Sequence, residues 1–342
     1  MKLSVVIVNF NNDRVLRGCL ESLPVALEGL DAEVILSDNG STDGSLEWVR
    51  ENHPQIRVLE NGANLGFAEA NNRAFPLTRG DFVLLLNPDT IVQGDAFRPM
   101  LEVFAAHPKA GAVGCMLRNA DGSRQISTRF TPTLSLYLYD FLGLSDRFPQ
   151  SRLFGRYSMT YWNGDDTRKV DWVSGAALMV RREALEATGG IDPYFFLTYD
   201  EVDWCHRIRD AGFEVWYTPQ GEVIHLDRQS EPQSNPEPEA RLRYMTVERN
   251  SRVRYFVKHR GALYAALVEL MHLVLNVALW LKASSFGTNR SSIETMEQRL
   301  FLTLYWRTAR RVPRAGYCAL LRALGRDAKY PVFTNPYLEG SR

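Results

Sequence analysis

The chain has 342 residues, of which 45% are hydrophobic and 23% charged, with 24 glycines and 16 prolines. This composition excludes fibrous, collagen-like and disordered proteins, and the length predicts one large α/β domain with an appendage, or two domains. The formal net charge is zero, but residues 239–342 hold 18 Lys and Arg against 7 Asp and Glu, so the end of the chain is basic and the remainder is acidic.

Short apolar runs alternate with helical patterns in the first part of the chain. The runs at residues 3–8, 34–36, 82–86 and 112–116 are rich in leucine and β-branched residues, and they predict buried parallel strands. The helical patterns lie at residues 14–23, 45–51, 68–75 and 96–106. This alternation predicts an α/β fold with a mostly parallel sheet, in which ligands bind beyond the carboxyl ends of the strands.

Polar loops follow three of these strands, at residues 9–12, 38–44 and 87–89. Each loop by itself is typical of a turn, but three loops at one edge of a sheet favour a binding site. The third contains Asn87, Pro88 and Asp89, and one aspartate suits Mg²⁺ or Mn²⁺ when a substrate diphosphate supplies further oxygens. His225, after a later short strand, is either a nitrogen ligand of that metal or a structural histidine.

A second block of structure extends from residue 170 to residue 226. A strand pattern begins at Trp172, a helix begins near Arg181, and Asp200, Glu201 and Asp203 open a helix that ends near residue 211. Carboxylates in a first helical turn either complement the helix dipole or provide a general base. Residues 118–169 are rich in aromatic residues and arginine without periodicity, and we expect long loops on the substrate side there.

A proline-rich linker is expected at residues 231–238, followed by a basic helical region at residues 239–342. Residues 261–281 are apolar except for Glu269, His272 and Asn276, which fall on one helical face. This pattern favours an interfacial or bundle-packed helix over a membrane span. The basic charge fits either contact with anionic lipids or a solvated helical face, and no nucleic-acid-binding motif accompanies it.

Several known signatures are absent from the sequence. There is no phosphate-binding G-x-x-x-x-G-K-[ST] loop, no G-x-G-x-x-G after the first strand, no H-E-x-x-H and no G-x-S-x-G. Their absence disfavours P-loop kinases and dinucleotide-dependent oxidoreductases. The four cysteines form no C-x-x-C pair and the first residues lack a signal-peptide pattern, so we expect a cytoplasmic protein without a zinc site.

Seven segments in order carry a family resemblance: SVVIVNFNN, EVILSDNGSTDGS, NLGFAEANN, DFVLLLNPDT, WVSGAALMVRREAL, GGIDPYFFLTYDEVDWCHRIRDAG and VIHL. Together they resemble an inverting glycosyltransferase of family 2 with the GT-A fold, in its bacterial rhamnosyltransferase-like branch. The resemblance covers roughly residues 3–260. It implies a GT-A domain over residues 1–230, with a nucleotide-sugar half at about 1–117, an acceptor half at about 118–230, and a C-terminal helical extension.

The resemblance also implies roles for individual residues. The residues expected to bind the nucleotide sugar are Val8, Asn9, Asp38, Asn64, Gly66, Asn71, Asn87 and Asp89. Asp89 and His225 are the expected ligands of Mg²⁺ or Mn²⁺, with Asn87 at the position where the family has the first Asp of its Asp-x-Asp motif. Glu201 is the expected general base, with Asp200 second, because the order of the family's Glu-Asp pair is reversed here. Asp203 either belongs to this catalytic group or orients the start of the helix. The expected acceptor-binding residues are Trp172, Gly175 and Ala176.

The implied reaction is metal-dependent sugar transfer with inversion of the anomeric carbon, from dTDP-L-rhamnose or a UDP-sugar to a glycan or polyprenyl-linked acceptor. Such an enzyme would act in cell-surface polysaccharide assembly, as a cytoplasmic protein at the inner face of the membrane, without a nucleic-acid partner. The alternative is a catalytically silent subunit of the same fold that only binds a nucleotide or a glycan.

Overall fold

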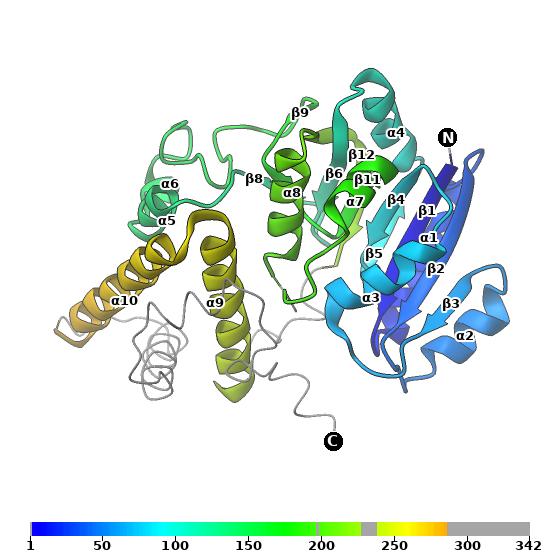
Figure 1. The fold of residues 1–342 in the computed structure, drawn as a ribbon, viewed down its shortest axis with the longest axis horizontal. Helices are drawn as coiled ribbons and strands as arrows, with labels where there is room; N and C mark the ends of the chain where they lie inside the picture. The colour runs from blue at the N-terminus through cyan, green and yellow to red at the C-terminus, as the bar shows by residue number, and fades with distance from the viewer. Residues whose placement is uncertain (1, 196–197, 227–237, 286–342) are drawn as a thin grey trace. The chain divides into compact units, whose positions relative to one another are not determined.

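The computed structural model describes residues 2–195, 198–226 and 238–285 (Figure 1). The expected linker, except for its last residue, and the basic region beyond residue 285 lie outside these described residues. The chain divides into two compact units. The first comprises Met1–Pro132, Gly143–Phe196 and Asp200–Glu231, and the second comprises Thr133–Leu142, Leu197–Tyr199 and Pro232–Arg342.

The strands of the first unit form one large mixed sheet and one small ribbon (Figure 1). The large sheet contains β1 Lys2–Asn9, β2 Asp31–Asp38, β3 Arg57–Glu60, β4 Phe82–Leu86, β5 Thr90–Gln93, β6 Ala110–Arg118, β7 Arg124–Gln125, β9 Arg168–Lys169, β11 Ala177–Arg181 and β12 Glu214–His225. Its order is β3-β2-β1-β4-β11-β6-β12-β5, with β7 beside β6 and β9 beside β12. The ribbon pairs β8 Thr128–Arg129 with β10 Trp172–Val173.

Strand direction places the polar loops at one edge of the sheet. β1 pairs in parallel with both β2 and β4, so the carboxyl ends of these three strands meet there. β11 is inserted between β4 and β6 and is antiparallel to both, which makes the sheet mixed. The expected strands at residues 3–8, 34–36, 82–86 and 112–116 all form, whereas β3 and β5 are additional.

Helices cover both faces of the sheet. The helices of the first unit are α1 Asp13–Ala26, α2 Ser45–Asn52, α3 Gly66–Ala74, α4 Phe97–Ala106, α6 Leu144–Arg147, α7 Arg182–Thr188 and α8 Asp200–Asp210, with the 3₁₀ turn η1 Phe75–Leu77. Alternate residues of β1, such as Val5 and Ile7, pack in one buried core with Leu16 of α1 and Phe97 of α4. Each such side chain contributes about 1.5–3 kcal/mol of hydrophobic free energy, so the edge that carries the loops is rigidly supported.

Close packing also places α8 against the sheet. A Cβ on Gly111 of β6 would lie 2.9 Å from Cγ2 of Ile208 in α8 and 2.5 Å from Cβ of Phe213. The absence of a side chain at residue 111 therefore lets α8 approach the strand. This contact fixes the helix that begins with the three expected catalytic carboxylates.

Residues 118–169 contain more regular structure than the long loops that the sequence predicts. They include β7, β8, α6 and a further helix, α5 Leu134–Phe141, which belongs to the second unit. The side chain of Thr133 caps α5 by accepting a hydrogen bond from Leu136 N. Helices of eight and four residues give too little periodic signal to stand out in an aromatic-rich segment.

The second unit also contains α9 Pro238–Arg260 and α10 Ala262–Ser285. The expected polar face of residues 261–281 lies on α10 and is buried. Glu269 accepts hydrogen bonds from Arg249 Nε (2.5 Å) and Arg252 Nη2 (3.0 Å) of α9, and all three residues are buried. Burial opposes ionisation of Glu269, but the two guanidinium groups outweigh it and lower the pKa of this carboxyl.

No helix among the described residues combines the length and the hydropathy of a membrane-spanning segment. The described cysteines, Cys19, Cys115 and Cys205, are buried free thiols, and burial raises the pKa of each to about 12. Cys318 lies outside the described residues.

Candidate active site

The ends of β1 and β2 are joined through buried polar side chains. Asn9 and Asp38 are partners in the strand register, and both are buried. Asn9 Nδ2 donates to Asp38 Oδ1 at 2.9 Å, and Asp38 Oδ2 accepts from the backbone N–H groups of Gly40 and Ser41 at 2.9 and 2.8 Å. Because a buried carboxylate requires such donors, these bonds hold the 38–44 loop in one conformation. Val8, the preceding residue of β1, is half-buried.

The expected residues Asn64, Gly66 and Asn71 shape the start of α3. Asn64 Oδ1 accepts from Gly66 N at 3.0 Å, and Gly66 has a φ of +80°, which favours glycine. Asn71 is buried within α3, where its Nδ2 donates to the backbone oxygen of Phe67 at 2.9 Å. Asn64 therefore precedes α3 and bonds its first residue, Gly66, whereas Asn71 stabilises the first turn of the helix from inside.

Asn87, Asp89 and His225 come together although up to 138 residues separate them. Asp89 Oδ1 lies 3.3 Å from His225 Nε2, and Asn87 Nδ2 lies 3.4 Å from the same nitrogen. Leu226 N also donates to the backbone oxygen of Asp89 at 2.9 Å, which ties the end of β12 to the 87–89 loop. The carboxylate of Asp89, the imidazole of His225 and the amide of Asn87 thus lie next to one another in a partly buried site.

Gln125 of β7 orients the imidazole of His225. Gln125 Nε2 donates to Asn119 Oδ1 at 3.1 Å, which leaves Gln125 Oε1 as the acceptor that lies 2.9 Å from His225 Nδ1. Nδ1 therefore carries a proton, and Nε2 is the ring nitrogen that faces Asp89. An imidazole nitrogen and a carboxylate oxygen that face each other are atoms that could hold a cation between them.

The first turn of α8 contains two carboxylates with different surroundings. Asp200 is buried, whereas Glu201 is half-buried. Burial, the negative charge of Glu201 and a hydrogen bond to Glu201 raise the pKa of Asp200 well above its usual value of 3.8. Asp200 therefore keeps its proton at a pH where an ordinary aspartate has lost it, and its O–H group donates a hydrogen bond to Glu201.

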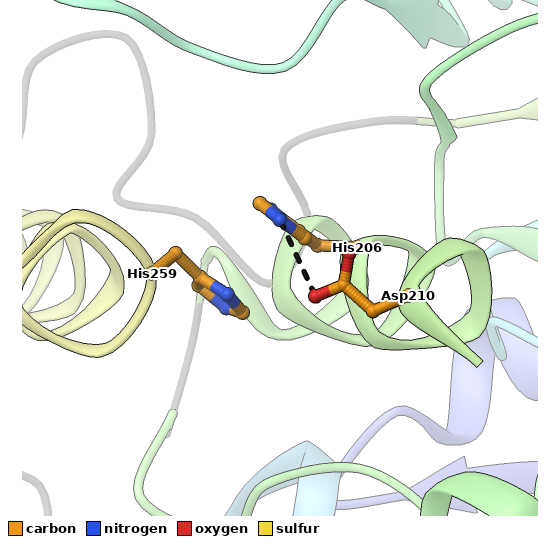
Figure 2. A group of neighbouring side chains, drawn as sticks. All are labelled: His206, Asp210 and His259. Carbon is orange, nitrogen blue, oxygen red and sulfur yellow. Dashed lines mark ion pairs between the residues drawn. The ribbon is translucent and has the colours of Figure 1, made fainter.

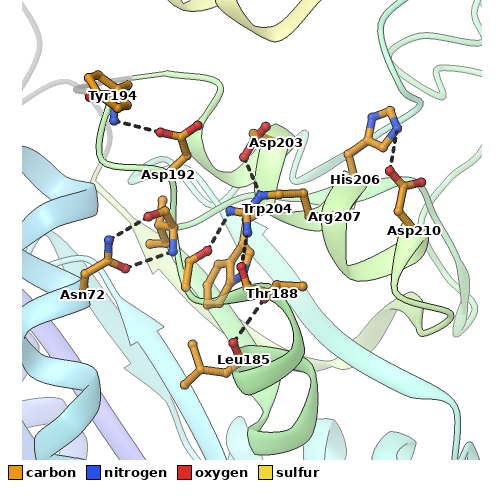
Figure 3. A network of polar contacts seen from close by, with 12 residues as sticks. Asn72, Leu185, Thr188, Asp192, Tyr194, Asp203, Trp204, His206, Arg207 and Asp210 are labelled. Carbon is orange, nitrogen blue, oxygen red and sulfur yellow. Dashed lines mark hydrogen bonds and ion pairs between the residues drawn. The ribbon is translucent and has the colours of Figure 1, made fainter. Parts of the chain in front are cut away.

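Asp203 belongs to a separate network that holds the preceding loop (Figure 3). It is fully buried and accepts a hydrogen bond from Arg207 Nε at 2.8 Å. Arg207 also donates to the backbone oxygens of Thr188 and Gly190 at 2.6 and 2.7 Å. Asn72 of α3 bonds both the N–H and the C=O of Ile191, so the 188–191 segment is held from two helices. The carboxylate of Asp203 therefore has a structural partner.

The other end of α8 carries a pair of its own. Figure 2 shows His206 directed toward Asp210, with 3.6 Å between Nε2 and Oδ2. Asp210 is exposed, so such a pair contributes little stability.

The segment 174–177 links the candidate metal position to the acidic turn. Ala176 O accepts a hydrogen bond from Asn87 N at 3.0 Å. A Cβ on the neighbouring Gly175 would lie 3.8 Å from Cβ of Glu201 and 3.8 Å from the ring of Phe67. Residue 176 is thus bonded to the 87–89 loop, and residue 175 has space for one carbon atom between its backbone and Glu201. Trp172 is buried and donates from Nε1 to Phe130 O at 3.1 Å, so its ring anchors the ribbon.

Some expected residues from the two halves of the domain are therefore neighbours: Asn87 and Asp89 lie beside His225, and Asn87 is bonded to Ala176. Three residues that take part in this arrangement were not expected from the sequence: Gln125, which orients His225; Phe67, beside Gly175; and Arg207, which pairs with Asp203. Gln125 and Phe67 give no local signal, because their partners are distant along the chain. The four-residue spacing of Asp203 and Arg207 on one helix was the available signal for that pair.

Known proteins share both the sequence pattern and the fold. The family described as glycosyl transferase family 2 matches residues 4–187. An N-acetylglucosaminyl-diphospho-decaprenol L-rhamnosyltransferase of Mycobacterium tuberculosis is 33% identical over 235 residues, which cover 65% of this chain and 75% of that protein. The rhamnosyltransferase WbbL of Escherichia coli is 25% identical over 231 residues, which cover 65% of this chain and 82% of that protein.

Among solved structures, a mannosyltransferase of Pyrobaculum calidifontis in complex with GDP-Man and Mn²⁺ superimposes with a TM-score of 0.52. The match has 15% sequence identity and covers 90% of this chain and 86% of the other. This likeness shows that the fold is that of GT-A glycosyltransferases.

Proposed function

We propose, because the chain belongs to glycosyl transferase family 2, that this glycosyltransferase transfers L-rhamnose from dTDP-L-rhamnose to a polyprenyl-linked or glycan acceptor. The relatives from M. tuberculosis and E. coli, both named as rhamnosyltransferases, support the choice of sugar. The M. tuberculosis relative further suggests an acceptor in which N-acetylglucosamine is joined to a lipid through a diphosphate.

The observation that carries the proposal is the position of the segment 174–177: Ala176 accepts a hydrogen bond from Asn87, and a Cβ on Gly175 would lie 3.8 Å from Cβ of Glu201. A transfer reaction needs the leaving group and the attacking hydroxyl on opposite sides of one carbon atom. The 87–89 loop would face the donor diphosphate, and Glu201 would face the acceptor hydroxyl, with Gly175 leaving room for the sugar between them. Both sides lie at the edge where α/β sheets bind ligands.

The donor atoms at Asp89 and His225 fit a divalent cation. Carboxylate oxygen and neutral imidazole nitrogen are ligands that Mn²⁺ accepts and Mg²⁺ tolerates, and Gln125 provides the second contact that orients the imidazole. A bound Mg²⁺ or Mn²⁺ would supply positive charge to the leaving diphosphate.

Glu201 would act as the general base. It removes the proton of the acceptor hydroxyl while the hydroxyl oxygen forms a bond to the anomeric carbon. The bond between that carbon and the diphosphate oxygen breaks, and attack from the opposite face inverts the configuration. Protonated Asp200 would orient Glu201 through their hydrogen bond, and Asp203 would position the turn through Arg207.

Contact with the inner face of a membrane would bring the enzyme to a lipid-linked acceptor. The large exposed apolar residues of α10 are spaced three, four or seven residues apart: Leu263, Leu267, Leu270, Val274 and Leu281. This spacing places them on one face of the helix, opposite Glu269 and His272. An apolar face of this kind suits the headgroup boundary of a bilayer.

Liposome cosedimentation tests the membrane contact. The wild type should cosediment with anionic vesicles, and a double substitution, L263E with L270E, should remove most of that binding. Glu21→Lys, a charge change on α1, serves as the control. Equal cosedimentation of wild type and double variant would exclude α10 as the contact.

A ligand-binding panel tests the reaction class. Thermal unfolding would be measured with dTDP, UDP or GDP, each with Mn²⁺, Mg²⁺ or excess chelator. A ligand at 100 times its Kd adds about 2.7 kcal/mol to the free energy of unfolding. We expect a shift with dTDP that chelator removes and that the Asp89→Asn variant lacks, whereas Asp95→Asn, at an exposed carboxylate, retains it. A UDP preference would change the sugar, and no metal-dependent shift with any nucleotide would favour the silent subunit.

Transfer itself is tested with dTDP-L-rhamnose and a short-chain lipid diphosphate of N-acetylglucosamine. A rhamnosylated product of inverted configuration is expected. Metal-dependent dTDP binding without any product from lipid-linked or glycan acceptors would reject the proposed reaction.

A further inference from the structure

Two arginines beside the β8–β10 ribbon stack on aromatic rings. The guanidinium carbon of Arg129 lies 5.3 Å from the ring centre of Trp172 and 6.0 Å from that of Tyr157. The guanidinium carbon of Arg156 lies 4.7 Å from the ring centre of Phe130. The backbone bond from Phe130 N to Tyr157 O, 3.0 Å long, places the two arginine-bearing segments side by side. We call Arg129 and Arg156 the stacked arginine pair.

Neither guanidinium of the stacked arginine pair has an ion-pair or hydrogen-bond partner within the described part of the chain. Asp171, the carboxylate in the adjoining strand connection, already accepts a hydrogen bond from Thr131 N at 2.7 Å and lies 3.5 Å from Arg209 Nη1. The local charge is therefore positive. Stacking on a ring uses the face of a guanidinium and leaves its N–H edge available for a planar, two-point contact with an anion.

The position of the pair relative to Glu201 indicates which anion fits. Arg129 is the register partner of Trp172, and Gly175, which adjoins Glu201, follows three residues later. Three residues of extended chain span at most about 10 Å. This is the length of one hexose and an attached phosphate. An acceptor sugar with its hydroxyl at Glu201 would place a phosphate on its reducing end near Arg129.

We propose that Arg129 and Arg156 bind the diphosphate of a lipid-linked acceptor sugar. The inference rests on the proposed function, because it takes Glu201 as the end of the site where the acceptor hydroxyl reacts. Guanidinium groups pair with phosphate oxygens through charge-assisted, often two-point hydrogen bonds. The site would select acceptors that carry a diphosphate over the same sugar without one. Its residues differ from Asp89 and His225, where the donor diphosphate is expected.

Steady-state kinetics with two acceptors test the site. The acceptors are N-acetylglucosamine joined to a short lipid through a diphosphate, and the same sugar as an alkyl glycoside. For the diphosphate acceptor, Arg129→Gln and Arg156→Gln should each raise KM at least tenfold and change kcat less than twofold. For the alkyl glycoside, and for the donor, KM should remain unchanged. Arg147→Gln, which removes an exposed arginine stacked on Phe148, is the matched control. Arg129→Lys should not restore KM, because lysine lacks the planar fork.

A binding measurement tests the same site without catalysis. Titration calorimetry would use geranyl diphosphate with the full chain, saturated with dTDP and Mg²⁺ so that the donor site is filled. Binding by the wild type that weakens at least tenfold in Arg129→Gln and in Arg156→Gln would support the proposal, even if no sugar transfer were observed. A wild type that does not bind geranyl diphosphate, or variants that bind it equally well, would overturn it, while rhamnosyl transfer could still occur. Arg156 is exposed, so its variant remains informative if Arg129→Gln does not fold.

Discussion

Replacing Glu201 with glutamine tests which carboxylate of the acidic turn removes the acceptor proton. Glutamine has nearly the same shape as glutamate and can still accept the hydrogen bond from Asp200, but it cannot take up a proton. Asn at residue 200, in contrast, can donate a hydrogen bond as protonated Asp200 does. The two substitutions therefore separate the base from the group that orients it.

Asp200 is buried and Glu201 is half-buried, so we expect the two substitutions to lower kcat by different factors. Positioned general bases contribute about 10²- to 10⁴-fold to rate, so Glu201→Gln should lower kcat by that factor, which corresponds to about 3–5 kcal/mol in the activation barrier. Asp200→Asn should lower kcat by less than about tenfold, because the hydrogen bond to Glu201 is kept.

The assay is rhamnosyl transfer at saturating donor and acceptor, with nucleotide binding measured in parallel as a control for the donor site. Both variants should bind dTDP and metal as the wild type does. A kcat for Glu201→Gln within tenfold of the wild type, together with a large loss in Asp200→Asn, would refute the assignment and make Asp200 the base.

The same pair makes an independent prediction about stability and pH. The pKa of Asp200 is higher in the folded protein than in the unfolded chain, so the folded state keeps a proton that the unfolded chain releases. The contribution of Asp200 to the free energy of unfolding is fully present below about pH 4. It decreases as the pH rises through the pKa of Asp200 in the folded protein. Asp200→Asn should therefore stabilise the protein more at pH 8 than at pH 4 in urea unfolding. An equal effect at both pH values would contradict the raised pKa.

Four further substitutions test the residues that support the site. Arg207→Met removes the ion pair of the buried Asp203 and should cost about 3–5 kcal/mol in urea unfolding. A loss under 1 kcal/mol would show that this pair is not needed. Gly114→Ala would place a Cβ 2.7 Å from Val173 and should lower the free energy of unfolding by about 1–3 kcal/mol. In Gly175→Ala the nearest atoms lie 3.8 Å from the new Cβ, so this variant should be as stable as the wild type but should raise the KM of the acceptor. Equal thermal stability of the two variants would argue against this packing. Gln125→Leu should weaken Mn²⁺ binding about 10- to 100-fold in a titration, and unchanged affinity would remove Gln125 from the metal site.

Local sequence patterns were sufficient for the elements that carry the site. The strands at residues 3–8 and 82–86 are short apolar runs followed by polar loops, and a run of this kind is stable only when buried in a sheet. Because consecutive strands with helical connections lie parallel, the polar residues Asn9, Asp38 and Asn87 had to meet at one edge. Membership in glycosyl transferase family 2 followed from these ordered segments.

The direction of β11 and the inward polar face of α10 were not determined by local patterns. A five-residue apolar run has the same period in either direction, so only its neighbours β4 and β6 decide its orientation. Sequence indicated that Glu269 and His272 share a helical face. In the structure, Arg249 and Arg252 of α9 pair with Glu269, so this carboxylate can be buried. The leucines on the opposite face of α10 remain exposed.

The chemical difference between Asp200 and Glu201 also comes from tertiary structure. The two residues are adjacent in a helix, so their side chains point about 100° apart, and composition cannot tell which one faces the interior. The structure buries Asp200 and leaves Glu201 half-exposed. It also places Gln125 against His225 across 100 residues of chain. Residue types and their order specify which groups are present, whereas burial and long-range contacts specify which of them hold a proton, because those properties depend on neighbours that only folding brings together.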